Sequence, residues 1–134
     1  MNSPRKVLHV EDDPTLRKLV KMALERIGGM EVLSCERGSD AVRQAPDYNP
    51  DIILLDAMMP EMDGPQTFKA LTCTMDLSNT PVLFMTARVQ AEELEEYRSL
   101  GAFGVIPKPF DPTTLHRELA DNYLRYFNEA RHLM

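Results

Sequence analysis

Carboxylates stand at the ends of two apolar segments in the first half of this sequence. Asp56 closes the apolar run at residues 52–55, and Glu11 and Asp12 directly follow a similar run at residues 7–10. Such runs are typical of strands buried on both faces, where an ionised carboxylate is costly unless something pairs with it. Asp56 therefore has either a structural partner or a chemical function.

A hydroxyl and an ammonium group follow two later apolar segments. Thr86 comes directly after residues 81–85, and Lys108 comes shortly after residues 104–106. If all four segments are strands of one parallel sheet, their carboxyl ends lie at the same edge, where such sheets bind their ligands. We therefore expect the acids, the hydroxyl and the ammonium group to converge.

Repulsion among the acids limits the chemistry of such a site. Two carboxylates about 4 Å apart repel by about 4 kcal/mol at an effective dielectric constant of about 20, so one of them holds a proton or a cation lies between them. Mg²⁺ prefers oxygen ligands of this kind. Beside Mg²⁺, Asp56 can stay ionised and attack phosphorus as a nucleophile, while Thr86 and Lys108 hold the phosphoryl oxygens.

Strand-like and helical patterns alternate along the chain, and each predicted strand is followed by a predicted helix. This alternation implies an α/β fold with a parallel sheet and right-handed crossovers. In the doubly wound strand order 2-1-3-4-5, the strands that carry the candidate residues lie side by side. Five strands are predicted at residues 7–10, 31–35, 52–55, 81–85 and 104–106, and five helices at residues 16–27, 39–45 (ended by Pro46), 65–75, 91–100 and 113 to about 128.

Composition predicts one acidic domain. The chain has 134 residues, a net charge of −6 and a pI near 5.0, which argue against a direct nucleic-acid partner. The domain is expected to span residues 1–134, with its core at about 5–127 and a short tail at 128–134. No apolar stretch approaches the ~20 residues of a membrane span and no signal peptide is recognisable, which predicts a cytoplasmic protein. We interpret Cys35 and Cys73 as free thiols.

Some residues near these motifs have structural interpretations. Asp13, which precedes a proline, predicts a helix N-cap. Gly64 predicts a turn that needs backbone freedom before the third helix, and His9 predicts a neutral imidazole packed inside a strand. The aromatic residues at positions 123–127 of the last helix fit core packing and a binding face equally well.

Four motifs resemble the receiver domain of bacterial two-component response regulators. They are VEDDP at residues 10–14, LLDAMMPEMDG at 54–64, MTA at 85–87 and KPF at 108–110. Each is weak alone, but all four occur in order at predicted strand ends, and the resemblance covers Lys6 to about Tyr123. It implies a flavodoxin-like fold in which Asp56 accepts a phosphoryl group from a phosphohistidine, with Mg²⁺ as the required cofactor.

The resemblance also assigns metal ligands. Glu11 and Asp12 match the acidic pair of the family. Asp12 and Asp56 match its carboxylate ligands of the metal, with Glu11 acting through water. The main-chain carbonyl of Met58 matches its main-chain ligand.

The same resemblance gives Thr86 the role of the switch hydroxyl and Lys108 that of the phosphate-binding lysine, with a cis peptide bond before Pro109. One departure is Val105, at a position that often holds Tyr or Phe, whose inward or outward pose reports phosphorylation. An aromatic switch is therefore not expected at Val105. Phe103, placed on the same predicted strand face, is the candidate substitute.

The expected function is that of a stand-alone signalling receiver, not an enzyme beyond its own phosphorylation and slow dephosphorylation. Its expected partners are a sensor histidine kinase or phosphotransfer protein, and a downstream protein bound by the face formed by helix four, strand five and helix five. Met58 and Arg88 match the positions that flank the path of attacking water in the family, and their bulk predicts slow loss of the phosphoryl group.

Three alternatives stay open at this point. A Mg²⁺-dependent phosphatase would also use Asp56 as an aspartyl nucleophile, but such enzymes typically need a second Asp two residues later, where Met58 stands. A receiver-like module that binds its partner without phosphorylation is the second alternative. A flavodoxin-like cofactor binder is the third, and it is disfavoured because acids crowd the edge where a phosphate-binding loop is expected.

Overall fold

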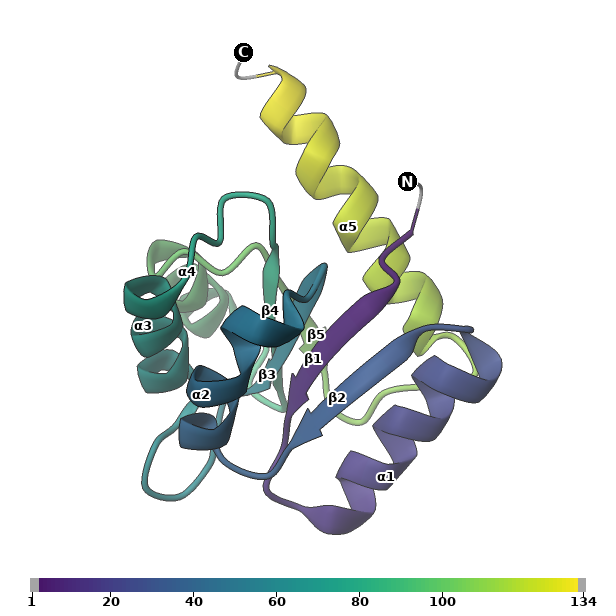
Figure 1. The fold of residues 1–134 in the computed structure, drawn as a ribbon. Coiled ribbons are helices and arrows are strands. Elements are labelled where there is room, and N and C mark those ends of the chain that lie inside the picture. The colour runs from purple at the N-terminus through teal and green to yellow at the C-terminus, as the bar shows by residue number, and fades with distance from the viewer. Residues whose placement is uncertain (1–2, 133–134) are drawn as a thin grey trace.

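A computed structural model describes residues 3–132 as a parallel sheet between two layers of helices (Figure 1). The five strands lie in the order β2-β1-β3-β4-β5. The predicted fold class and strand order are therefore confirmed. The strands are β1 (Lys6–Val10), β2 (Glu31–Cys35), β3 (Ile52–Asp56), β4 (Val82–Thr86) and β5 (Gly104–Pro107).

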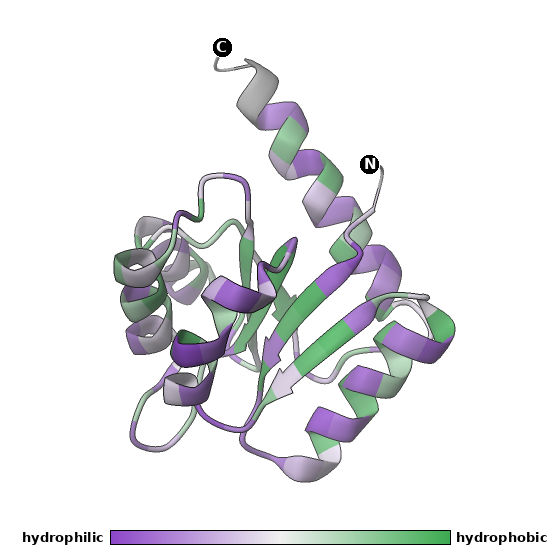
Figure 2. Ribbon diagram, viewed as in Figure 1, coloured by the Kyte–Doolittle hydropathy of each residue, from purple (hydrophilic) through white to green (hydrophobic). Residues whose placement is uncertain are grey.

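Helices cover both faces of the sheet. The helices are α1 (Pro14–Met22), which continues as the π-helical turn η1 (Ala23–Ile27), α2 (Gly38–Tyr48), α3 (Gly64–Thr74), α4 (Ala91–Ser99) and α5 (Leu115–His132). One face packs against α1, η1 and α5, and the other packs against α2, α3 and α4. Every residue of β3 and β4 is buried as a result, which explains the apolar runs that Figure 2 shows in the strands. None of the helices within residues 3–132 is both long and apolar enough to cross a membrane.

Two helices end later than the sequence predicts. Helix α2 passes through Pro46 and stops at Tyr48, where Asn49 adopts a left-handed conformation with φ of 54°. Proline removes one main-chain donor near the end of this helix, whereas asparagine tolerates the left-handed conformation that ends it. Helix α5 continues to His132, so the predicted tail from residue 128 is helical up to that point; residues 133 and 134 lie outside the described part.

The aromatic residues of α5 pack against the domain. Tyr123 is buried in the core, and the Tyr126 hydroxyl donates to the carbonyl oxygen of Ser78 at 2.6 Å. The Tyr126 ring meets Phe103 edge to face at 5.2 Å. Phe103 thus packs with α5, while Val105 packs on the opposite face of the sheet, among the buried residues under α2, α3 and α4. The prediction that Phe103 shares a face with Val105 is wrong, because Phe103 precedes the first residue of β5.

Candidate functional site

The carboxyl ends of β1 and β3 place two acids side by side. These strands are neighbours, and Val10 lies opposite Leu55 in the parallel register. The next residue along each strand is an acid, Glu11 after Val10 and Asp56 after Leu55. Glu11, Asp12 and Asp56 each offer a carboxylate oxygen within 4.8 Å of the others.

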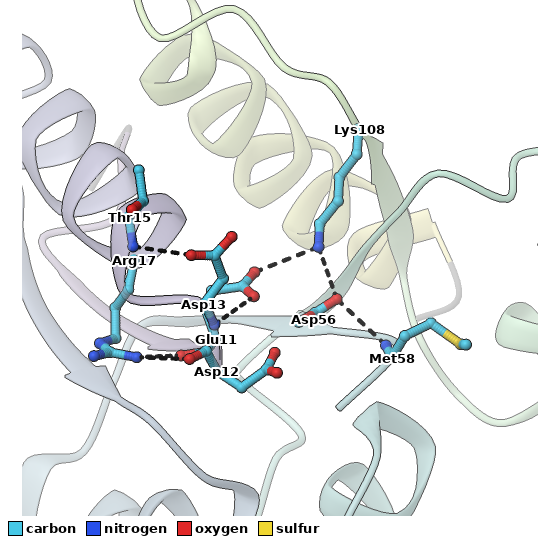
Figure 3. A network of polar contacts seen from close by, with 8 residues as sticks. All are labelled: Glu11, Asp12, Asp13, Thr15, Arg17, Asp56, Met58 and Lys108. Atoms are coloured by element: carbon cyan, nitrogen blue, oxygen red, sulfur yellow. Dashed lines mark hydrogen bonds and ion pairs between the residues drawn. The ribbon is translucent and has the colours of Figure 1, made fainter. Parts of the chain in front are cut away.

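Lys108 reaches this acidic group from the end of β5 (Figure 3). Its Nζ atom lies 2.9 Å from Oδ1 of Asp56 and 3.4 Å from Oε1 of Glu11. In the described part of the chain, it is the only cationic side chain within ion-pair distance of these acids. One ammonium group thus pairs with two of the three carboxyl groups, and the site has an excess of negative charge.

Burial and charge both shift the proton affinities in the site. Glu11 is 1% exposed and Asp56 is 3% exposed. Burial, and then the negative charge of Asp56, raise the pKa of Glu11 from 4.5 to about 7. Burial alone would lower the pKa of Lys108, but hydrogen bonding to Asp56 and the charges of Asp56 and Glu11 outweigh it and raise that pKa.

The residues present fit a divalent cation. Their donors are carboxylate oxygens, which Mg²⁺ prefers, and they lie close enough together to share one ion. A cation would also relieve the repulsion that raises the pKa of Glu11. The acidic cluster is therefore typical of a Mg²⁺ site.

The loop after β3 is held close to Asp56. The Met58 N–H donates to Oδ1 of Asp56 at 3.3 Å, while Met58 as a residue is 63% exposed. Gly64 begins α3 directly beside this loop, and a Cβ atom there would lie 2.6 Å from the Asp56 carbonyl oxygen. Glycine is thus needed at position 64 because the main chain of Asp56 passes too close for a Cβ atom. The sequence predicted glycine here for a different reason, the backbone freedom of a turn.

Thr86 is buried at the end of β4, where its contacts are with its own turn and with β5. Its hydroxyl oxygen accepts the N–H of Arg88 at 3.0 Å, and its carbonyl accepts the N–H of Lys108 at 2.9 Å. The hydroxyl proton is not used by the Arg88 contact. The peptide bond between Lys108 and Pro109 is cis, as the resemblance implies.

The turn between β1 and α1 contains a contact that the sequence did not reveal. Arg17, on α1, donates from Nη1 to the carbonyl oxygens of Glu11 at 2.8 Å and Asp12 at 3.4 Å (Figure 3). Asp13 caps α1 as predicted, because its Oδ1 accepts the Thr15 N–H at 3.0 Å. An arginine in the second turn of a helix is usually solvated, so its position in the sequence carried no signal.

His9 lies beneath the site inside β1 and is completely buried. Burial, and then the positive charges of Lys108 and Arg17, lower its pKa to about 3. The imidazole is therefore neutral, as the sequence predicts, and neither ring nitrogen has a hydrogen-bond partner among the described residues.

Comparison with known proteins identifies the family. Residues 7–120 match the family described as response regulator receiver domain. The chain belongs to this family. The receiver is similar to chemotaxis protein CheY-3 of Vibrio cholerae, with 31% identity over 119 residues that make up 89% of this chain and 92% of CheY-3. It also matches regulatory protein AtoC of Escherichia coli, with 33% identity over 111 residues. The match covers 83% of this chain but only 23% of AtoC, which is a longer protein.

Solved structures agree with this assignment. Chemotaxis protein CheY4 of Vibrio cholerae superposes with a TM-score of 0.81 at 33% identity, covering 87% of this chain and 97% of CheY4. The receiver domain of a modulated diguanylate cyclase from Desulfovibrio desulfuricans G20 has a TM-score of 0.76 at 32% identity, covering 95% and 98% of the two chains. The protein is thus a receiver of two-component signalling, a signalling module rather than an enzyme, and the phosphatase and flavodoxin-like alternatives fall away.

Proposed function

We propose that Asp56 of this receiver accepts a phosphoryl group from the phosphohistidine of a sensor histidine kinase or a phosphotransfer protein. A carboxylate oxygen of Asp56 forms a bond to phosphorus, the bond between phosphorus and the histidine nitrogen breaks, and that nitrogen takes a proton from solvent. The observation that carries the proposal is the unequal charge around Asp56: two other acids and a single ammonium group surround a carboxylate that is 3% exposed. Such surroundings favour binding of a cation, and a carboxylate that stays ionised beside the cation can attack an electrophile such as phosphorus.

Each neighbouring residue has a task in this transfer. Asp12, Asp56 and the Met58 carbonyl would hold Mg²⁺, and Glu11 would act through water. When bound, Mg²⁺ supplies positive charge that offsets the charge of the phosphoryl oxygens. Lys108, already 2.9 Å from Asp56, would hold a phosphoryl oxygen by its ammonium group.

Thr86 would link the phosphoryl group to the rest of the domain. Its hydroxyl oxygen accepts from Arg88 N–H, so its proton is free to donate to a phosphoryl oxygen. Such a contact would favour one of two conformations of the face formed by α4, β5 and α5 and change the binding of a downstream protein there. The receiver is expected to act in the cytoplasm, without binding nucleic acid directly. The tyrosine or phenylalanine switch has no counterpart at Val105.

Phosphoryl uptake from a small acyl phosphate in the presence of Mg²⁺ tests the proposal. Intact-protein mass spectrometry should show a single added phosphoryl group on the wild-type protein, and none on Asp56→Asn. Asp51→Asn is the matched control, because Asp51 precedes the other end of the same strand; it should label like the wild type. Equal labelling of Asp56→Asn and wild type would refute the assignment of Asp56.

A further inference from the structure

We infer that Arg17 is a positioning residue for the cation site, which holds the main chain of Glu11 and Asp12 so that their carboxylates face Asp56. The inference rests on the proposed function, because it concerns the ion that the phosphoryl transfer requires. Arg17 itself does not contact the carboxylates in the described structure; it donates to the carbonyl oxygens of the two residues that carry them.

The segment that Arg17 holds lies between two regular elements. Sheet pairing of this segment ends with the Glu11 N–H, which donates to the Cys35 carbonyl at 3.0 Å. Helical hydrogen bonding begins with the Asp13 carbonyl, which accepts the Arg17 N–H at 2.9 Å. The carbonyl oxygens of Glu11 and Asp12 therefore take part neither in the hydrogen bonds of the sheet nor in those of the helix. Within residues 3–132 their donor is the Arg17 guanidinium. Main-chain carbonyls near a protein interior need such a partner.

The same turn is held from the other side by the carboxylate of Glu11. Its Oε2 atom accepts the Asp13 N–H at 3.2 Å, while Oε1 lies 3.4 Å from Lys108 Nζ. The side chain of Glu11 is thus tied to the turn and to β5, and its main chain is tied to α1 through Arg17. Asp13 also joins the turn to the start of the helix, but among the described residues only the guanidinium donates to the carbonyl oxygens of Glu11 and Asp12. If the guanidinium is removed, these two residues lose that support, and their carboxylates are less well placed to meet Asp56.

The charge of Arg17 and its positioning role predict opposite changes in Mg²⁺ affinity when Arg17 is removed. A guanidinium repels Mg²⁺, so that its removal would tighten Mg²⁺ binding if charge alone mattered. Loss of a residue that orients metal ligands typically weakens metal binding by about 10- to 100-fold. The sign of the change in Mg²⁺ affinity therefore separates the two explanations.

The experiment measures binding of Mg²⁺ alone by titration calorimetry, without a phosphodonor. Arg17→Met keeps much of the apolar stem and loses the charge and the donors; we expect Mg²⁺ to bind about tenfold more weakly. Arg17→Lys keeps the charge and, because both contacts come from the single atom Nη1, keeps a group able to donate to the same carbonyl oxygens; it should bind Mg²⁺ more tightly than Arg17→Met. Lys18→Met removes an exposed charge from the same helix and should not weaken binding. Unfolding in EDTA checks that each variant is folded.

Equal or tighter Mg²⁺ binding by Arg17→Met would overturn the inference. If that variant does not fold, Arg17→Gln, which also removes the guanidinium and its charge, decides, and Mg²⁺ binding equal to or tighter than that of wild type overturns the inference. Phosphoryl uptake gives a second readout: saturating Mg²⁺ should restore the uptake rate of Arg17→Met, and a loss that Mg²⁺ does not restore would contradict a positioning role. If wild type binds Mg²⁺ but takes up no phosphoryl group, the proposed function fails while the role of Arg17 in Mg²⁺ binding is still decided by the calorimetry.

Discussion

Strand β3 has a carboxylate at each end, and the two carboxylates have opposite surroundings. Asp51, just before the strand, accepts the main-chain N–H groups of Arg5 and Lys6 on its Oδ2 atom, both at 2.9 Å. Asp56, the last residue of the strand, shares the Lys108 ammonium with Glu11 and lies within 4.8 Å of two other carboxyl groups.

The difference shows what turns a carboxylate into a candidate site. Main-chain N–H donors satisfy Asp51, tie the first strand to the third and bring no further negative charge near it. Around Asp56 the negative charges outnumber the positive ones, and this imbalance favours a bound cation. Position at a strand end is common to both residues, so it is the neighbours that distinguish an acid satisfied by main-chain donors from one surrounded by an excess of negative charge.

Removing the ammonium group beside Asp56 should have the largest effect. Lys108→Met is expected to lower the rate of phosphoryl uptake by about 10²- to 10³-fold, the usual cost of losing a donor that stabilises a transition state. Lys6→Met is the control: Lys6, in β1, lies beside the opposite end of β3, and the substitution removes an ammonium group there while it keeps the main-chain N–H that Asp51 accepts. Uptake from an acyl phosphate, followed by mass spectrometry, compares the two. A similar loss in both variants would mean that Lys108 has no special role.

Stability should respond in the opposite order. Asp51→Ala leaves two main-chain donors without their acceptor and should lower the free energy of unfolding by about 2 kcal/mol. Asp56→Asn loses the ion pair with Lys108 but relieves the repulsion with Glu11, which still pairs with Lys108, so the metal-free protein should stay about as stable as wild type. Urea unfolding in EDTA measures both. If Asp56→Asn proves the more destabilised variant, the contrast between the two ends of β3 is incorrect.

The raised pKa of Glu11 predicts a pH dependence of the metal-free protein. Because this pKa is about 7 in the folded state, above its ordinary value of 4.5, folding is favoured by bound protons. That contribution is fully present below about pH 4.5 and is lost as the pH rises through about 7. Glu11→Gln should therefore gain stability relative to wild type between pH 5 and pH 8 in EDTA, and Mg²⁺ should stabilise wild type more than the variant at pH 8.

Thermal unfolding of both proteins at the two pH values tests this prediction. Buried His9 has a lowered pKa of about 3 and makes stability rise with pH up to its ordinary value of 6.5. It acts in both proteins, so the difference between them isolates Glu11. A constant difference between pH 5 and pH 8 would show that folding does not raise the pKa of Glu11.

The smallest expected effect concerns the lifetime of the phosphoryl group. Met58 stands two residues after Asp56 and is 63% exposed, so its side chain can lie between solvent and the phosphorylated carboxylate. If its bulk hinders attack by water, Met58→Asn should shorten the half-life of the phosphorylated protein several-fold, with little change in uptake. Decay after removal of the phosphodonor, followed by mass spectrometry, measures this lifetime. An unchanged half-life would show that the Met58 side chain does not shield the phosphoryl group from water.

Local patterns in the sequence were sufficient to predict the strands, their order and the acids at their ends. Apolar runs, helix caps such as Asp13 and the four motifs involve residues that are close together in the chain, and the carboxyl ends of parallel strands necessarily share one edge. The passage of α2 through Pro46 was not predictable in this way, because its stop depends on the conformation of Asn49.

Only the tertiary structure decided which charged groups are satisfied by their neighbours. From the sequence, Asp51 carried no signal, Arg17 was one of several basic residues in a helix, and the group that the Thr86 hydroxyl contacts was not decided. Their contacts join Asp51 to the start of β1, Arg17 to the carbonyls at its end, and Thr86 to the N–H of Arg88. Composition and motif spacing can place an acid at a strand end, but its proton affinity and reactivity depend on donors and charges whose distances are set by folding.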